Sequence, residues 1–131
     1  MAIALFVAQF EEYRSVIISH LYTVKLFHWD RNIRQLSAIS LRGLASLDPA
    51  FMKRFVIPYL VEKCTHQDLI VRHGALLGLA EVILALGQTE YEADILVDIT
   101  ELVTKIEKLR LYRGRGGEIM RSAVCRFIEC F

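Results

Sequence analysis

The chain has 131 residues, a length typical of one domain, and 54% of them are hydrophobic. Lysine and arginine together number 16 against 15 aspartates and glutamates, so the formal net charge is +1. No overall field draws such a chain to nucleic acid or to an anionic membrane, and neither is expected as a partner. Three cysteines without a CxxC pair indicate reduced thiols and a cytoplasmic setting.

Apolar residues recur at three- and four-residue steps along nearly the whole chain, which contains only two prolines and seven glycines. This pattern predicts an all-α protein. Two helices are expected over residues 2 to 9 and 11 to 27. A third helix is expected to begin after Asp30, which suits the capping position, and to end at the Asp48-Pro49 break.

The next helix is expected to start at the same break, with Asp48 as its cap and Pro49 at its first position, where the missing N–H costs nothing. This helix should extend to residues 64 to 67. Pro58 falls inside it and removes a backbone hydrogen bond, so the sequence predicts a kink there.

The following helix is expected over residues 69 to 86, between a cap at Asp68 and a stop at Gly87. It is apolar almost all round. The longest apolar stretch of the chain, residues 74 to 87, contains Glu81 and is shorter than the roughly 18 to 20 residues needed to cross a bilayer, so a core helix is predicted. An amphipathic helix over residues 95 to 109 and a last helix over residues 118 to 131 complete the chain.

A short pattern, D-x-x-[IV]-R, occurs twice in the sequence. Asp30 and Arg34 recur as Asp68 and Arg72, in each case 38 positions later. A fainter third copy places Arg121 in the position of the two earlier arginines. A period near 40 residues is typical of HEAT-like and armadillo-like repeats, in which each unit is a pair of helices.

The sequence therefore predicts an all-α HEAT/armadillo-like helical-repeat solenoid of about three helical hairpins. The predicted repeats are residues 11 to 47, 48 to 87 and 90 to 131, with residues 1 to 10 as the remnant of a preceding repeat. The helices that carry Arg34, Arg72 and Arg121 are expected to lie side by side in one layer. Each aspartate should cap its helix, and each arginine should reach a carboxylate in its own or the adjacent repeat, so these residues are interpreted as framework.

No sequence motif for catalysis or nucleotide binding occurs in the chain. Cys64, His66 and His73 do not form a convincing metal site, because a paired second half and a fourth ligand are missing. We therefore expect no enzyme activity, no metal and no cofactor. The alternative from another class is a small helical enzyme that uses Cys64 or a histidine in a pocket.

The glycine-rich turn before the last helix is the candidate partner-binding segment. It contains Arg113, Arg115, Gly116 and Gly117. The turn resembles an RNA-binding RGG segment, but it occurs once, between two apolar helices, and not as a repetitive disordered tract. Its glycines permit positive φ, and backbone amides at the start of a helix attract an acidic group of a partner.

Three segments resemble one known family in the same order along the chain. They are residues 28 to 38 (HWDRNIRQLSA), 71 to 75 (VRHGA) and 111 to 121 (LYRGRGGEIMR). Together they are similar to the tubulin-specific chaperone D family, also called tubulin-folding cofactor D. Gly43 departs from this similarity, since the family tends to have a larger residue there.

The resemblance implies an internal segment of a much longer chaperone. Such a protein captures β-tubulin, works with tubulin-folding cofactors C and E and with an Arf-like small GTPase, and helps to assemble or dismantle αβ-tubulin heterodimers. The GTP hydrolysed in that cycle belongs to tubulin, and the setting is the cytoplasm, in association with microtubules or the centrosome. The alternative is a generic HEAT or armadillo adaptor with a different protein client.

Overall fold

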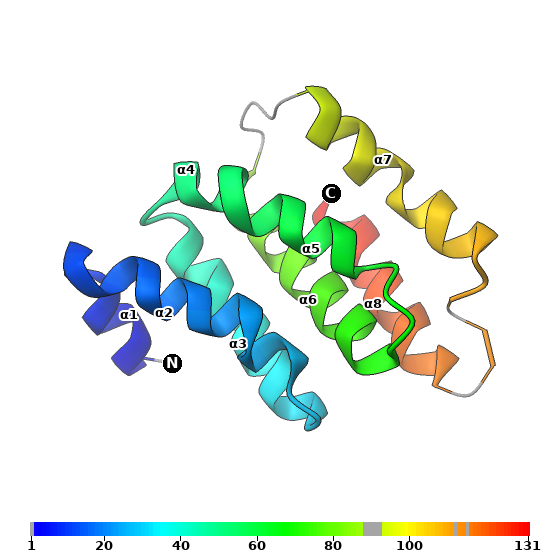
Figure 1. Cartoon of the computed structure of the whole chain (residues 1–131), viewed down its shortest axis with the longest axis horizontal. Coiled ribbons are helices and arrows are strands. Elements are labelled where there is room, and N and C mark those ends of the chain that lie inside the picture. The colour runs from blue at the N-terminus through cyan, green and yellow to red at the C-terminus, as the bar shows by residue number, and fades with distance from the viewer. Residues whose placement is uncertain (1, 88–92, 112, 115) are drawn as a thin grey trace.

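The computed structural model describes residues 2 to 87, 93 to 111, 113, 114 and 116 to 131. Within these residues the structure consists of helices and turns without a strand (Figure 1). The helices are α1 (Ala2–Ala8), α2 (Glu11–Thr23), the 3₁₀ turn η1 (Lys25–Phe27), α3 (Arg31–Ala45), α4 (Pro49–Phe51), the π-helical segment η2 (Met52–Val56), α5 (Ile57–Lys63), α6 (Leu69–Leu86), α7 (Ala93–Lys108) and α8 (Gly117–Cys130).

The helices pack in two layers. α3, α6 and α8 lie side by side in one layer, with α6 in the middle (Figure 1). α2, the α4 to α5 segment and α7 form the other layer, and α2 packs on α3 while α5 packs on both α6 and α7. This repeat-like arrangement confirms the predicted all-α solenoid, and it places the helices of Arg34, Arg72 and Arg121 together. The repeat boundaries stay a prediction, and residues 90 to 92 of the third lie outside the described residues.

Three aspartates cap helices as the sequence predicts. Asp30, Asp48 and Asp68 each accept a hydrogen bond from a backbone N–H two or three residues later, at 2.8, 3.2 and 2.9 Å. α6 then runs to Leu86 and stops at Gly87, which has a φ of 61°. These local signals fix the starts of three helices and the end of the longest one, because a satisfied backbone N–H or a left-handed residue defines a helix end.

The helix predicted over residues 11 to 27 is interrupted. α2 ends at Thr23, and the chain makes the separate 3₁₀ turn η1 before α3. The reason is the fit of Leu26, which is fully buried, against two glycines of α6. A Cβ atom at Gly74 would overlap the carbonyl oxygen of Leu26, and one at Gly78 would lie 2.6 Å from its Cδ1. The glycines therefore let the backbone of η1 approach α6 closely.

A π-helical segment lies just before Pro58, the position at which the sequence predicts a kink. The Ile57 N–H donates to the carbonyl of Met52, five residues earlier, which is the π-helical pattern. Since Pro58 has no N–H to donate, the segment before it is where the helix departs from regular bonding. α5 then begins with this proline in its first turn.

α6 has the length and composition of a membrane-spanning helix, with 18 residues and a mean hydropathy of 1.9. Two-thirds of it is buried inside the protein (67%), because α3, α5 and α8 pack around it. It is the core helix that the sequence predicts. Leu79 on α6 is fully buried, as are Leu41 on α3 and Met120 on α8.

α1 packs on α2 and α3 at the first edge of the layer pair. Its Leu5 lies over Gly43 of α3, where an added Cβ would be 2.9 Å from Leu5 Cδ2. The small residue at position 43 thus makes room for a side chain of α1. This contact gives the departure at Gly43 a local packing explanation.

Candidate protein-interaction groove

The two repeat arginines make the same kind of contact in successive repeats. Arg34 Nη1 donates to the carbonyls of His28 and Trp29, both at 2.9 Å, and its Nε donates to His73 Nδ1 on α6 at 3.1 Å. The arginine thereby ties the loop before its own helix to the next helix of the layer.

Arg72 repeats this arrangement one unit later. Its Nη1 donates to the carbonyls of His66 and Gln67 at 2.9 and 3.0 Å, and its Nη2 donates to the carbonyl of Leu111 at 3.1 Å. The expected carboxylate partners are wrong for Arg72, as they are for Arg34, because both arginines donate to backbone carbonyls instead. The loop before each helix turns its carbonyls toward the guanidinium, while the aspartate is occupied with capping.

The third predicted copy is displaced by one residue. Gly116 occupies the capping position of α8, so Met120 stands where Arg34 and Arg72 stand in the earlier helices. Met120 is fully buried, whereas Arg121 is exposed. Arg121 therefore lies in the expected helix but does not take the framework position, which is a correction to the predicted repeat signature.

A groove runs along the free face of the layer formed by α3, α6 and α8. It has a volume of about 400 Å³. We call it the three-helix groove, and its lining residues are Arg31, Gln35, Ala38, Ile39, His73, Leu77, Glu81, Ser122, Ala123 and Arg126. All of them come from the three helices of this layer, so the groove faces away from α2, α5 and α7. Solenoid proteins bind their partners on such extended faces.

The charges of this layer are unbalanced. α3, α6 and α8 contain six arginines, three glutamates, and no lysine or aspartate. Glu81, which is 7% exposed, accepts from Arg42 on α3 at 3.1 Å and from Arg126 on α8 at 3.2 Å. One carboxylate thus bridges the three helices and leaves an excess of positive charge around the groove.

His73 lies in the groove lining at only 1% exposure. Burial, followed by the neighbouring charges of Arg34 and Arg31, lowers its pKa to about 4. The imidazole is therefore neutral at physiological pH. Because Nδ1 accepts from Arg34, the ring proton is on Nε2.

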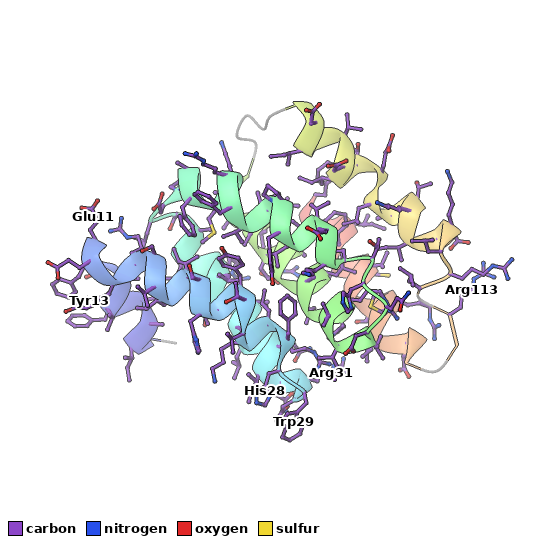
Figure 2. The ribbon with its side chains drawn as sticks, in the orientation of Figure 1. Glu11, Tyr13, His28, Trp29, Arg31 and Arg113 are labelled. Atoms are coloured by element: carbon purple, nitrogen blue, oxygen red, sulfur yellow. The ribbon has the colours of Figure 1, made fainter. Side chains whose placement is uncertain are left out.

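Two glycines of the turn that was predicted to bind a partner are explained by the local backbone and packing. Gly116 has a φ of 79°, and a Cβ there would overlap the side chain of Leu69. Gly117 is buried at the start of α8. Arg113 is exposed and projects from the end of the molecule (Figure 2), where it pairs with Glu107 at 2.9 Å. Arg115 lies outside the described residues.

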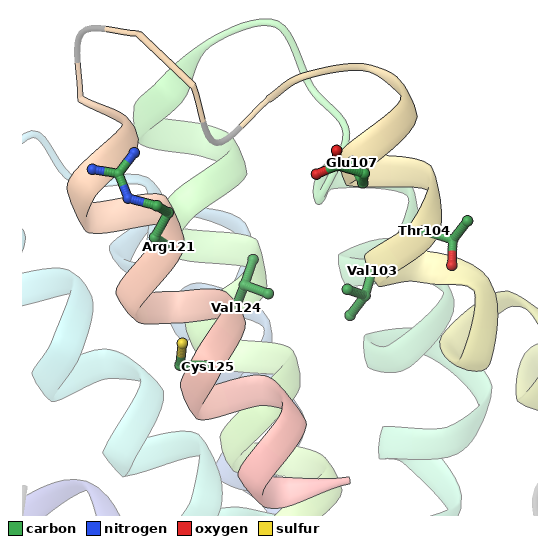
Figure 3. Close-up of a pocket in the computed structure, with 6 residues that line it drawn as sticks. All are labelled: Val103, Thr104, Glu107, Arg121, Val124 and Cys125. Atoms are coloured by element: carbon green, nitrogen blue, oxygen red, sulfur yellow. The ribbon is translucent and has the colours of Figure 1, made fainter.

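A second hollow, of about 530 Å³, lies between α7 and α8 (Figure 3). Val103, Thr104 and Glu107 line it from α7, and Arg121, Val124 and Cys125 line it from α8. It is more apolar than the three-helix groove. Arg121 thus lies at the rim of this cleft.

The residues considered for metal or thiol chemistry are dispersed. Burial raises the pKa of the Cys64 thiol far above its usual range, and Cys125 is exposed on α8. His66 Nδ1 accepts from the backbone N–H of Asp68. Over the part of the chain that the structure describes, no group of three histidine, cysteine or acidic side chains is placed to hold a metal ion.

The sequence reasoning missed the three-helix groove. Its positive walls come from Arg31 on α3 and Arg126 on α8, far apart in the chain. A local signal does exist, since Arg31, Gln35 and Arg42 follow helical spacing along one side of α3. The pairing of that side with α8 depends on tertiary packing and carries no local pattern.

Comparison with known proteins identifies a relative. The chain is 31% identical over 132 residues to Tubulin-specific chaperone D of Dictyostelium discoideum, a match that covers 94% of this chain. The chain spans 9% of the length of that relative. No family model matches the chain, and no solved structure matches it significantly. The chain is thus related to a short segment of a tubulin-specific chaperone D.

Proposed function

We propose that this chain is a protein-binding segment of a tubulin-folding chaperone, which captures β-tubulin and takes part in the assembly and disassembly of αβ-tubulin heterodimers. The observation that carries the proposal is the similarity to Tubulin-specific chaperone D, which extends over 94% of the chain. The repeat-like helical layers support it, because stacked helices present long surfaces to protein partners.

In this proposal the segment acts by binding and not by catalysis, and it uses no cofactor. Its repeat arginines stabilise the stack of helices, since each satisfies carbonyls within the protein. Exposed side chains of the α3, α6 and α8 layer remain for a partner. Stimulated GTP hydrolysis, where it occurs, takes place on tubulin.

The proposed partners beyond β-tubulin are tubulin-folding cofactors C and E and an Arf-like small GTPase. The proposed location is the cytoplasm, in association with microtubules or the centrosome. The basis for both is the relation to a tubulin-specific chaperone D. Neither a nucleic acid nor a membrane is proposed as a partner, because the net charge of +1 gives no general attraction to either.

A pull-down from cytosol tests this function. The chain is immobilised, incubated with cytosol, and the retained proteins are identified by mass spectrometry beside an immobilised helical-repeat protein of unrelated sequence. Retention of tubulin or of its folding cofactors on this chain alone supports the proposal. Specific retention of another client, without tubulin, indicates the generic adaptor and contradicts the tubulin proposal.

A further inference from the structure

The three-helix groove is lined by a neutral histidine that carries a hydrogen-bond donor. His73 lines the groove, its Nδ1 is occupied by Arg34, and its Nε2 carries the proton. The hydrogen bond with Arg34 uses Nδ1 and leaves the Nε2–H outside that contact. An acceptor brought into the groove can therefore accept a hydrogen bond from this N–H.

Positive charge surrounds this donor. Beside the larger effect of burial, Arg31, an exposed residue in the first turn of α3, lies close enough to His73 and Arg34 to lower the pKa of both electrostatically. Gln35 follows one helical turn later in the same groove wall. An acceptor that bears negative charge therefore gains from both the guanidinium and the imidazole N–H.

Small residues form part of the groove lining beside His73. Ala38 on α3 and Ala123 on α8 are both 2% exposed and line the same groove. Arg126 on α8, whose side chain is 39% exposed, pairs through Nε with Glu81 at 3.2 Å and through Nη1 with Glu129 at 3.6 Å. Since a guanidinium has five N–H donors, it keeps donors for a further acceptor. Ala38, Leu77 and Ala123 give the groove apolar surface beside the cationic side chains of Arg31 and Arg126, and Glu81 is the carboxylate among the lining residues. This mixture suits a peptide, which brings both apolar and acidic side chains, better than a nucleic-acid backbone.

We propose that the three-helix groove binds an extended acidic peptide segment of a partner protein, with one carboxylate between Arg31 and the Nε2–H of His73 and another at Arg126. The inference rests on the proposed protein-binding function and adds to it the place and the chemistry of the partner. Extended peptides direct alternate side chains to one face, so such a peptide can turn several acidic side chains toward the groove.

Peptide binding measured by fluorescence anisotropy tests this inference. The probe is a short fluorescein-labelled peptide in which glutamate alternates with alanine, compared with the same peptide containing glutamine in place of glutamate. The test variant is Arg31→Gln, and the matched control is Arg54→Gln, which removes the same charge from an exposed site in the other layer. Circular dichroism is used to check that each variant keeps its helical content.

The glutamate peptide should bind more tightly than the glutamine peptide, and Arg31→Gln should weaken it about tenfold, as expected for loss of a charge-assisted hydrogen bond. Arg54→Gln should change the affinity less than about twofold. Equal binding of the two peptides, an equal loss in both variants, or tighter binding of a single-stranded RNA of equal charge overturns the inference. Tubulin capture that Arg31→Gln leaves intact would preserve the proposed function and remove this groove from it.

Discussion

Arg34 on α3 donates from Nε to Nδ1 of His73 on α6, at 3.1 Å, across two successive repeats. The same guanidinium holds the carbonyls of His28 and Trp29 in the loop before α3. One side chain therefore fixes a loop, a helix start and the neighbouring helix. Burial, with the positive charge of Arg34 as the next cause, lowers the pKa of His73 and keeps the ring neutral, so the contact joins the packing of the layer to its response to pH.

Stability should fall in mild acid because of His73. Its pKa is lowered from 6.5 to about 4 in the folded protein, so protonation favours unfolding. Above pH 6.5 protonation of His73 does not reduce the free energy of unfolding. As the pH falls from 6.5 toward 4, this free energy decreases by up to about 3 kcal/mol. Urea denaturation at a series of pH values measures it. The variant His73→Gln cannot titrate there and should show a flatter profile, whereas identical profiles would contradict the assignment.

Arg72 and Arg121 should differ sharply when each is replaced by alanine. Arg72→Ala leaves three carbonyls without their charged donor and should destabilise the fold by about 2 to 4 kcal/mol. Arg121→Ala removes an exposed side chain and should cost less than about 1 kcal/mol. Chemical denaturation compares the two. If Arg121→Ala lowers the free energy of unfolding as much as Arg72→Ala does, Arg121 holds the same structural position as Arg34 and Arg72, and the correction made above is wrong.

Two helical glycines give opposite expectations. Gly74→Ala places a methyl group on the backbone carbonyl of Leu26 and should cost at least about 2 kcal/mol, since backbone has little room to yield. Gly43→Ala meets only the end of the Leu5 side chain, and the gain in helix propensity of about 1 kcal/mol should offset the contact. Thermal unfolding tests both. Similar losses at the two sites would mean that η1 does not pack tightly on α6.

Leu79 should be among the most sensitive core positions. It is fully buried on α6, which packs against α3, α5 and α8. Leu79→Ala should destabilise the protein by about 2 to 5 kcal/mol because a cavity remains in the middle of the layers. The natural comparison is Leu84→Ala on the same helix, where the side chain is 41% exposed. If the free energies of unfolding fall equally in both, α6 is not the enclosed core helix.

The glycine-rich turn gives a binding prediction. Changing Arg113 and Arg115 together to glutamate in the full-length protein should weaken capture of tubulin or of a folding cofactor while the helical content stays unchanged. The loss should be largest at low salt, where opposed charges are screened least. The control changes Lys105 and Lys108 to glutamate, two exposed positions on α7. Unchanged capture at low ionic strength would make the turn a connector only.

Local patterns predicted the helix starts and the period of the repeat. Asp30 and Asp68 each cap a helix, and the arginine four residues later occupies the same position in both. The third copy was shifted because Met120-Arg121 imitates the earlier pairs while no aspartate marks the start of α8. Gly116, in a left-handed conformation, occupies the capping position instead. The sequence therefore shows an arginine in this helix but not how far that arginine lies from the helix start.

Other features arise from tertiary packing and leave no local pattern. The periodicity of residues 11 to 27 continues through the break after Thr23, which is set by the fit of Leu26 against Gly74 and Gly78. The groove likewise needs α3 and α8 on either side of α6. The spacing of apolar residues shows which face of one helix is buried. It does not show that two helices far apart in the chain, such as α3 and α8, pack against the same third helix.

Direct binding of purified tubulin to the purified chain tests the central claim. The chain carries a fluorescent label and is titrated with αβ-tubulin, with Arg31→Gln as the groove variant and Arg54→Gln as the charge-matched control. The account predicts saturable binding by the wild-type chain and the control, and a clear loss of affinity in Arg31→Gln. The absence of saturable binding by a chain whose helices are intact would contradict the proposal that this segment captures tubulin.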